Sequence, residues 1–106
     1  MRRVPQHIAV CSVIAVLTVP SLVFADAAAD YKGKCRACHG PDGVPSEVMA
    51  KSMGVKPLGG DEVQAMSDAD LSTAIANGKG KMKGMKGTLT DAQIGDLVKY
   101  IRTLKK

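Results

Sequence analysis

The five residues Cys35-Arg36-Ala37-Cys38-His39 constrain this chain more than any other feature of its sequence. The pattern C-x-x-C-H is the attachment signature of a c-type haem. On a helix, positions 35, 38 and 39 share one face, because residues three and four apart are neighbours there. Two thiols at this spacing can each bond one vinyl group of a porphyrin, and the adjacent imidazole can bind the iron from one side. The segment therefore predicts one haem c per chain, with Cys35 and Cys38 as covalent tethers and His39 as an axial ligand.

Three other interpretations of this segment explain its cysteines and histidine less completely. A thioredoxin-like redox pair is expected in a βαβ setting, and nothing in the sequence alternates strands with helices. A zinc site needs four ligands, whereas Cys35, Cys38 and His39 supply three, and His7 and Cys11 lie in a segment that we expect to be removed. A disulfide between Cys35 and Cys38 would leave His39 without a role. Haem attachment explains all three residues.

The first 25 residues have the pattern of a cleaved secretory signal peptide. Arg2 and Arg3 give a positive start, and residues 8–19 form an apolar run. Val23-Phe24-Ala25 places small or modest residues at the −3 and −1 positions of a cut before Asp26. The apolar run is shorter than the roughly 20 residues of a membrane span. We therefore expect export to the periplasm and no stable membrane insertion after cleavage, with an uncleaved anchor as the alternative.

Removal of residues 1–25 leaves residues 26–106, an 81-residue chain that we expect to form one domain. Tyr31 and Tyr100 are the only aromatic residues of this part. A chain of this size buries little apolar surface, so a haem would form much of its core. Loss of the two N-terminal arginines lowers the formal net charge from +5 to +3. The lysines that remain have no interleaved aromatic residues, so we do not expect nucleic-acid binding.

Periodicity and capping residues predict an all-α domain without strands. A first helix is expected over residues 27–38, because Tyr31 and the two cysteines fall on one face of it. Ser46, Ser67 and Thr90 are typical N-cap residues for three further helices, and Gln93 completes a capping box with Thr90. The last of these helices has the strongest 3.6-residue periodicity, carried by Ile94, Leu97, Val98, Ile101 and Leu104.

The second axial ligand decides between electron transfer and an open iron site. The expected mature chain has one histidine, which excludes ligation by two histidines of the same chain. A methionine sulfur is the next candidate, because it favours ferrous iron and raises the reduction potential. Met49, Met53 and Met66 lie in or beside apolar helical patterns, where core packing is the simpler role. Met82 and Met85 lie in a glycine-rich loop with no helical face to fill, and spacing alone does not separate them.

Over essentially all of residues 26–106 the chain resembles the class I cytochromes c, small single-haem electron carriers. The resemblance rests on the segments Cys35-Arg36-Ala37-Cys38-His39-Gly40 and Asn77-Gly78-Lys79-Gly80-Lys81-Met82. In similar cytochromes the ligand methionine precedes a Leu-Ser/Thr helix start by the interval between Met82 and Leu89-Thr90, which implies Met82 as the second ligand. The implied fold is all-α, with three to four helices around one covalently bound haem and with crossing N- and C-terminal helices.

The resemblance also implies particular contacts. Tyr31 matches the usual aromatic residue at the helix crossing, with Leu97 and Tyr100 as its partners on the last helix. Relatives brace the proximal histidine through a backbone carbonyl in a proline-containing loop, and Pro57 is the candidate here. Many relatives have a proline directly after the ligand methionine, where this chain has Lys83.

The expected function is one-electron transfer in the periplasm rather than catalysis on a substrate. With His39 and Met82 both on the iron, no coordination position remains for a substrate. Lysines at positions 79, 81, 83 and 86 are expected to ring the exposed haem edge and to attract acidic patches on the donor and acceptor proteins. We expect a monomer. The alternatives are a haem-based ligand sensor or weak peroxidase with a labile methionine, and a tightly docked electron-transfer subunit of a larger oxidoreductase.

Overall fold

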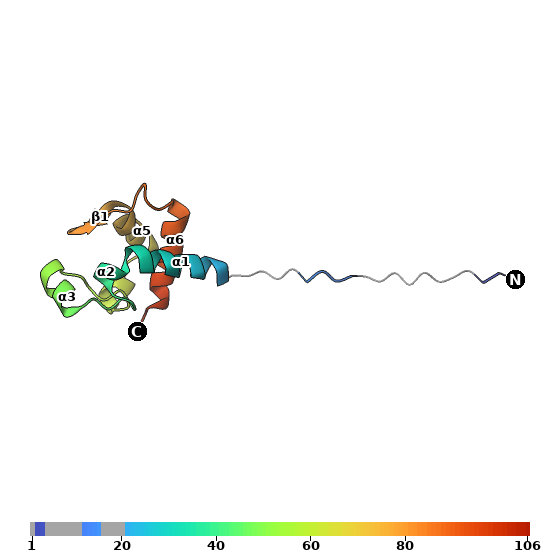
Figure 1. The fold of residues 1–106 in the computed structure, drawn as a ribbon, viewed down its shortest axis with the longest axis horizontal. Coiled ribbons are helices and arrows are strands. Elements are labelled where there is room, and N and C mark those ends of the chain that lie inside the picture. The colour runs from blue at the N-terminus through green and yellow to red at the C-terminus, as the bar shows by residue number, and fades with distance from the viewer. Residues whose placement is uncertain (1, 4–11, 16–20) are drawn as a thin grey trace.

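The computed structural model describes residues 2–3, 12–15 and 21–106, so the signal peptide predicted at residues 1–25 lies largely outside the described residues. The domain is mostly helical, as predicted, and its helices gather into one body (Figure 1). Within the described residues, four helices have seven or more residues and two have four residues. The longer helices are α1 (Ser21–Lys34), α3 (Glu47–Met53), α5 (Asp68–Asn77) and α6 (Asp91–Thr103), and the shorter ones are α2 (Arg36–His39) and α4 (Asp61–Gln64).

Three of the helices begin at the cap residues predicted from the sequence. The hydroxyls of Ser46 and Ser67 each accept a hydrogen bond from the backbone N–H three residues further on, at 3.2 and 3.1 Å. The Thr90 hydroxyl accepts from the Gln93 N–H at 3.1 Å, and the Gln93 side chain accepts from the Thr90 N–H at 2.8 Å. These bonds satisfy backbone donors that a helix start leaves unpaired, so the predicted starts of α3, α5 and α6 are confirmed.

The first helix differs from the prediction at both ends. It begins at Ser21 rather than Ala27, and it is interrupted at Cys35, after which α2 continues to His39. The interruption is slight, because the Cys35 N–H still donates to the Tyr31 carbonyl at 2.8 Å and the His39 N–H to the Cys35 carbonyl at 2.9 Å. The two helices therefore keep the haem-attachment motif on a nearly continuous helical path.

A small hairpin corrects the expectation that the domain has no strand. Strands β1 (Gly78–Lys79) and β2 (Met82–Lys83) pair antiparallel, with Lys79 opposite Met82. The connecting turn is possible because Gly80 adopts a left-handed φ of 59°, which glycine tolerates without steric cost. Strands of two residues have no visible alternation of polar and apolar residues, which is why the sequence pattern did not reveal them.

The core forms where α1 packs against α6 (Figure 1). Tyr31 of α1 and Leu97 of α6 are 2% and 1% exposed, and Ala27, also on α1, is buried as well. The ring centroids of Tyr31 and Tyr100 lie 5.1 Å apart, and the ring planes are tilted by 44°. This spacing is within the range in which aromatic side chains attract each other. The helix crossing implied by the family resemblance is thus present, with the expected residues at it.

Helix α6 is also fastened to the segment around α4. The Gln64 amide donates to the carbonyls of Leu58 at 2.8 Å and Ile101 at 3.0 Å. The Arg102 guanidinium donates to the carbonyls of Gln64 at 2.8 Å and Met66 at 2.6 Å. These bonds fix the backbone on either side of α4 against the last helix. Among the described helices, none combines the length and the hydropathy needed to cross a bilayer.

Candidate functional site

A cavity of about 640 Å³ opens between the α1–α2 segment, the end of α3, the loop before α4, helix α5 and the hairpin. Its volume falls within the roughly 300–1,000 Å³ typical of cofactor pockets. Helix α6 closes the inner side. The inner wall is apolar and is formed by Leu58, Val63, Leu71, Ala74, Ile75, Leu97 and Ile101.

The structure brings the three residues of the predicted attachment motif to this cavity. Cys35, Cys38 and His39 all line it, because positions 35, 38 and 39 fall on the same side of the α1–α2 path. Cys35 is half-buried and Cys38 is exposed, and both are free thiols. The motif therefore presents two thiols and one imidazole to a single apolar space.

The His39 imidazole is suited to bind a metal. Burial lowers the pKa of His39, so the ring is held in the neutral form that a metal ligand must have. Its Nδ1 atom is buried, and no group of the described chain hydrogen-bonds to it. A buried polar atom without a partner usually has a functional explanation. The expected brace from Pro57 is not formed, and the Pro57 carbonyl accepts from the Gly60 N–H at 3.2 Å in a tight turn.

Tyr31 holds the end of the motif in place. Its hydroxyl donates to the Gly40 carbonyl at 2.6 Å, directly after His39. Burial and, to a lesser extent, the nearby Cys35 thiol raise the pKa of Tyr31 to about 12, so the phenol remains a donor. Burial also raises the pKa of Cys35. Gly40 has a φ of 81°, and a Cβ there would overlap the Val44 carbonyl, so this turn requires glycine.

Four methionines, rather than two, contribute to the cavity lining. Met82 and Met85 are half-buried there, and Met66 packs between the cavity and the core. Met53 also lines the cavity but is 38% exposed, so its predicted role as core filler is wrong. Met53 is the last residue of α3, and Gly54 in a left-handed cap turns the chain there toward the cavity. In the sequence, only the position of Met53 directly before Gly54 indicated that it could lie at the cavity.

Basic residues stand around the mouth of the cavity. Lys79, Lys81 and Lys83 of the hairpin are exposed, line the mouth, and make no ion pair within the described residues. Lys34 and Lys56 complete the rim from α1 and from the loop before α4. Sequence reasoning missed these two because they are far from the hairpin along the chain.

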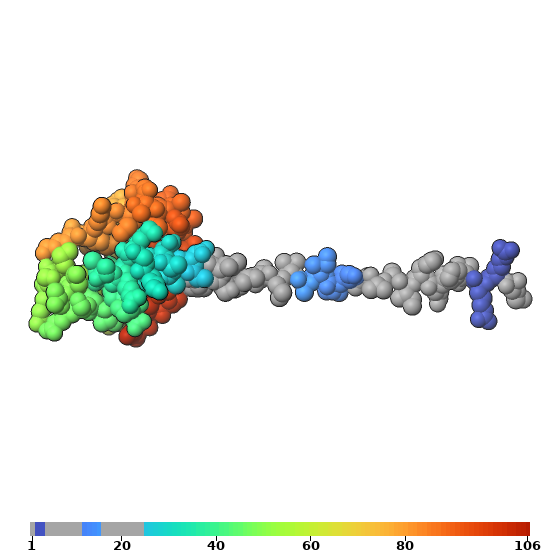
Figure 2. Space-filling model, viewed as in Figure 1, coloured from blue at the N-terminus to red at the C-terminus, as the bar shows by residue number. Residues whose placement is uncertain are grey.

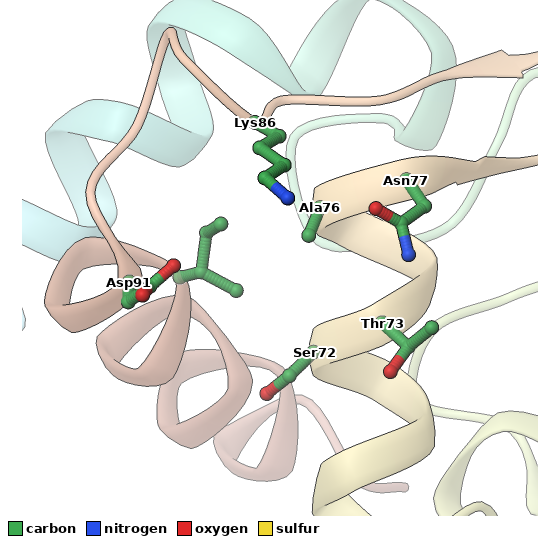
Figure 3. A pocket seen from close by; sticks show the side chains of 7 residues that line it. Ser72, Thr73, Ala76, Asn77, Lys86 and Asp91 are labelled. Carbon is green, nitrogen blue, oxygen red and sulfur yellow. The ribbon is translucent and has the colours of Figure 1, made fainter.

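A second hollow, of about 400 Å³, lies between α5 and the start of α6. The side chains of Lys86 and Asp91 enter it (Figure 3). Lys86 therefore faces a different part of the surface from the other three lysines of its cluster, contrary to expectation. None of the residues that line this hollow is a thiol, an imidazole or a thioether, so it offers no haem attachment. Its lining consists of Ser72, Thr73, Ala76, Asn77, Lys86, Asp91 and Ile94.

Comparison with known proteins identifies the family. Residues 23–101 match the family described as cytochrome c oxidase, cbb3-type, subunit III. The chain belongs to the class I c-type cytochromes. A solved structure, the KustC0563 c-type cytochrome, is similar to this cytochrome with a TM-score of 0.70 and 31% sequence identity, over 76% of this chain and 99% of that chain. No match was found among the curated proteins.

As a c-type cytochrome, the protein is an electron-transfer haem protein with a covalently bound haem c and with redox partners. Its predicted all-α cytochrome c fold is confirmed. The residues of the cavity fit the group. This cytochrome combines a thiol pair at the attachment spacing, a neutral imidazole with an unsatisfied nitrogen and a large apolar wall, while the second hollow has none of these.

Proposed function

We propose that this cytochrome is a periplasmic one-electron carrier that holds one haem c through Cys35 and Cys38, with His39 and Met82 as axial ligands. The main support is that a single apolar cavity gathers the paired thiols, an imidazole kept neutral by burial and the hairpin methionine. A bound haem supplies reversible one-electron chemistry at its iron. The protein then needs no substrate pocket of its own.

Each residue of the cavity has a distinct task in this proposal. Cys35 and Cys38 hold the group covalently, so that it is retained in both redox states. His39 offers a nitrogen that is not protonated, and Met82 offers a soft sulfur that favours the ferrous state. The wall formed by residues such as Leu71 excludes water, which raises the reduction potential by disfavouring the more highly charged state.

Met82 is proposed as the ligand in preference to Met85 for two reasons. The interval from Met82 to the helix start at Thr90 is that of similar cytochromes. In addition, the backbone of Met85 is held to the wall, because its N–H donates to Ile75 at 2.8 Å and its carbonyl accepts from Leu89 at 2.9 Å. Met82 belongs to the hairpin at the mouth of the cavity, where small backbone adjustments can bring its sulfur to the iron.

The partners are proposed to be donor and acceptor proteins with acidic patches. The exposed lysines of the hairpin carry positive charge that no acidic side chain of the described residues neutralises through an ion pair. Such a cluster raises the rate of encounter with negative surfaces. We propose that the carrier works as a monomer.

A second candidate is an electron-transfer subunit docked in a larger oxidoreductase. The matching family is named for a subunit of an oxidase, which favours this candidate. A docked partner would cover the exposed apolar side chains of Val44 and Val48, which lie beside and on α3 and are 48% and 70% exposed. Size-exclusion chromatography of the protein purified gently from its native cells separates the two candidates. A free carrier elutes near the mass of its own domain, and a docked subunit elutes with its complex.

Absorption spectra test the site. They are to be recorded on the purified protein, oxidised and reduced, with and without carbon monoxide. A low-spin spectrum with a near-infrared sulfur-to-iron band and no prompt response to carbon monoxide, so that binding is at most slow, supports His39 and Met82 as the ligands of the iron. A prompt response to carbon monoxide, or no sulfur band, would reject the six-coordinate carrier and favour a ligand sensor or weak peroxidase.

A further inference from the structure

We propose that Lys81 is a positioning residue, whose ammonium group clasps the β1–β2 hairpin to the last turn of α3 and thereby holds Met82 in place. The Lys81 Nζ donates a 2.8 Å hydrogen bond to the carbonyl oxygen of Ser52, which lies 29 residues earlier in the chain. The inference rests on the proposed role of Met82 as the second iron ligand. It assigns to Lys81 a task that the other rim lysines do not share.

The hairpin has few other attachments. Within the described residues, no other side-chain hydrogen bond joins residues 78–83 to the rest of the chain. Its base is held where the N–H groups of Met85 and Lys86 donate to the carbonyls of Ile75 and Ala76, at 2.8 and 3.0 Å. Backbone hydrogen bonds therefore anchor the base of the hairpin. At its tip, Lys81 is the one described residue whose side chain makes a hydrogen bond to the rest of the chain.

The acceptor on α3 is suited to bind an ammonium group. Carbonyls in the last turn of a helix lack partners within the helix, and lysine side chains often bond to them. The N–H groups of Gly54 and Val55 both donate to the Met49 carbonyl, so they leave the carbonyl of Ser52 free. Lys81 thus satisfies a backbone group that the cap of α3 does not.

The clasp spans the mouth of the cavity. Ser52 is followed directly by four cavity-lining residues, 53–56, and Lys81 is followed directly by Met82. In Figure 2 the green surface of α3 and the orange surface of the hairpin meet at the same end of the molecule. Opening the clasp would free the tip of a hairpin whose turn contains Gly80, and would let the residue next to Lys81 move away from the iron.

The test compares two variants of the haem-loaded protein. Lys81→Met removes the ammonium group and keeps the aliphatic stem. Lys83→Met removes the same charge two residues away on the same rim, from a side chain that makes no hydrogen bond within the described residues. The rate of carbon monoxide binding to the reduced protein and the amide hydrogen exchange of residues 78–83 are measured for both, and for Lys81→Arg as a variant that can still donate.

We expect Lys81→Met to raise both rates by about three- to tenfold, the range for loss of one solvent-accessible hydrogen bond. Lys83→Met should stay close to the wild type, and Lys81→Arg should recover most of the difference. Equal exchange in the two Met variants would overturn the clasp. Faster exchange without faster carbon monoxide binding would overturn the positioning of Met82.

Failure of the underlying ligand assignment gives a different result. If the oxidised wild type lacks a sulfur-to-iron band, Met82 is not the ligand and the positioning role is lost. The exchange of residues 78–83 in Lys81→Met against Lys83→Met then still decides whether the clasp itself exists.

Discussion

The hydroxyl of Tyr31 donates a 2.6 Å hydrogen bond to the carbonyl oxygen of Gly40, the residue that follows His39. The same side chain packs against Tyr100 of α6, with ring centroids 5.1 Å apart. One buried residue therefore connects the end of the haem-attachment motif with the crossing of α1 and α6.

Loss of this hydroxyl should weaken the fold. Tyr31→Phe keeps the ring but leaves the Gly40 carbonyl without its side-chain donor, and we expect the free energy of unfolding to fall by about 1–2 kcal/mol. Tyr100→Phe is the matched control, because the Tyr100 hydroxyl makes no hydrogen bond in the described part of the chain. Denaturant titration of the haem-loaded proteins measures both. Equal losses in the two variants would show that the bond to Gly40 contributes nothing.

The same phenol predicts a loss of stability in alkali. Burial is the main cause that raises the pKa of Tyr31 from 10.0 to about 12 in the folded chain. A group whose folded pKa is raised contributes stability that is complete below the unfolded pKa and is lost as the pH rises through the folded one. The difference in unfolding free energy between wild type and Tyr31→Phe should therefore shrink between pH 10 and 12. A difference that stays constant over this range contradicts the assignment.

The two hairpin-region methionines should behave differently when truncated. Met82→Ala should abolish the sulfur-to-iron band, lower the reduction potential and open the reduced iron to carbon monoxide, because the sulfur ligand is removed. Met85→Ala should keep the band. It should lower the free energy of unfolding by no more than about 5 kcal/mol, since it removes a packing residue that is only half-buried. Spectra and redox titration of both variants make the comparison. Loss of the band in Met85→Ala alone would exchange the two roles.

Two glycines with opposite surroundings provide a test of packing. A Cβ on Gly59 would overlap the Leu104 carbonyl oxygen, so Gly59→Ala should destabilise the protein by about 1–3 kcal/mol. Gly95, inside α6, has no atom within 4 Å of such a Cβ. Gly95→Ala should therefore stabilise the helix by about 0.5–1 kcal/mol. Thermal unfolding measures the sign of the stability change in both variants. A stabilised Gly59→Ala variant would contradict the packing at Gly59, and a destabilised Gly95→Ala variant would contradict the open space at Gly95.

Charge at the cavity mouth should control the rate of encounter with acidic partners. Lys79→Met and Lys83→Met should slow electron transfer to an acidic redox protein at about 0.01 M salt, and the effect should vanish near 1 M, where screening is nearly complete. Lys105→Met is the control, because Lys105 is exposed but does not line the cavity. Stopped-flow rates against ionic strength give the answer. A rate that does not depend on salt would rule out steering by these lysines.

Local signals in the sequence predicted the features that depend on a few adjacent residues. The spacing of Cys35, Cys38 and His39 sufficed to place them on one side of a helix, and the capping box at Thr90 gave the start of α6. The short helix α4 was missed because its four residues carry too little periodicity to be recognised.

Features that depend on distant parts of the chain could not be predicted in the same way. The approach of Lys34 and Lys56 to the hairpin lysines and the exposure of Met53 follow from how the loops pack. The absence of the Pro57 brace could not be predicted either, because the path of the loop that contains Pro57 is set together with distant residues of the last helix, to which Gln64 connects Leu58.

The packing of α1 on α6 has a consequence for the order in which the protein matures. Ribosomes release residues 21–34 long before residues 91–103, and domains are completed only when their last element emerges. Until then Tyr31 lacks its partner Tyr100, and the segment with Cys35 and Cys38 has no finished core against it. A newly made chain thus holds Cys35 and Cys38 in an open segment before α6 packs on α1, and the packing of α6 then closes the inner wall of the cavity behind them.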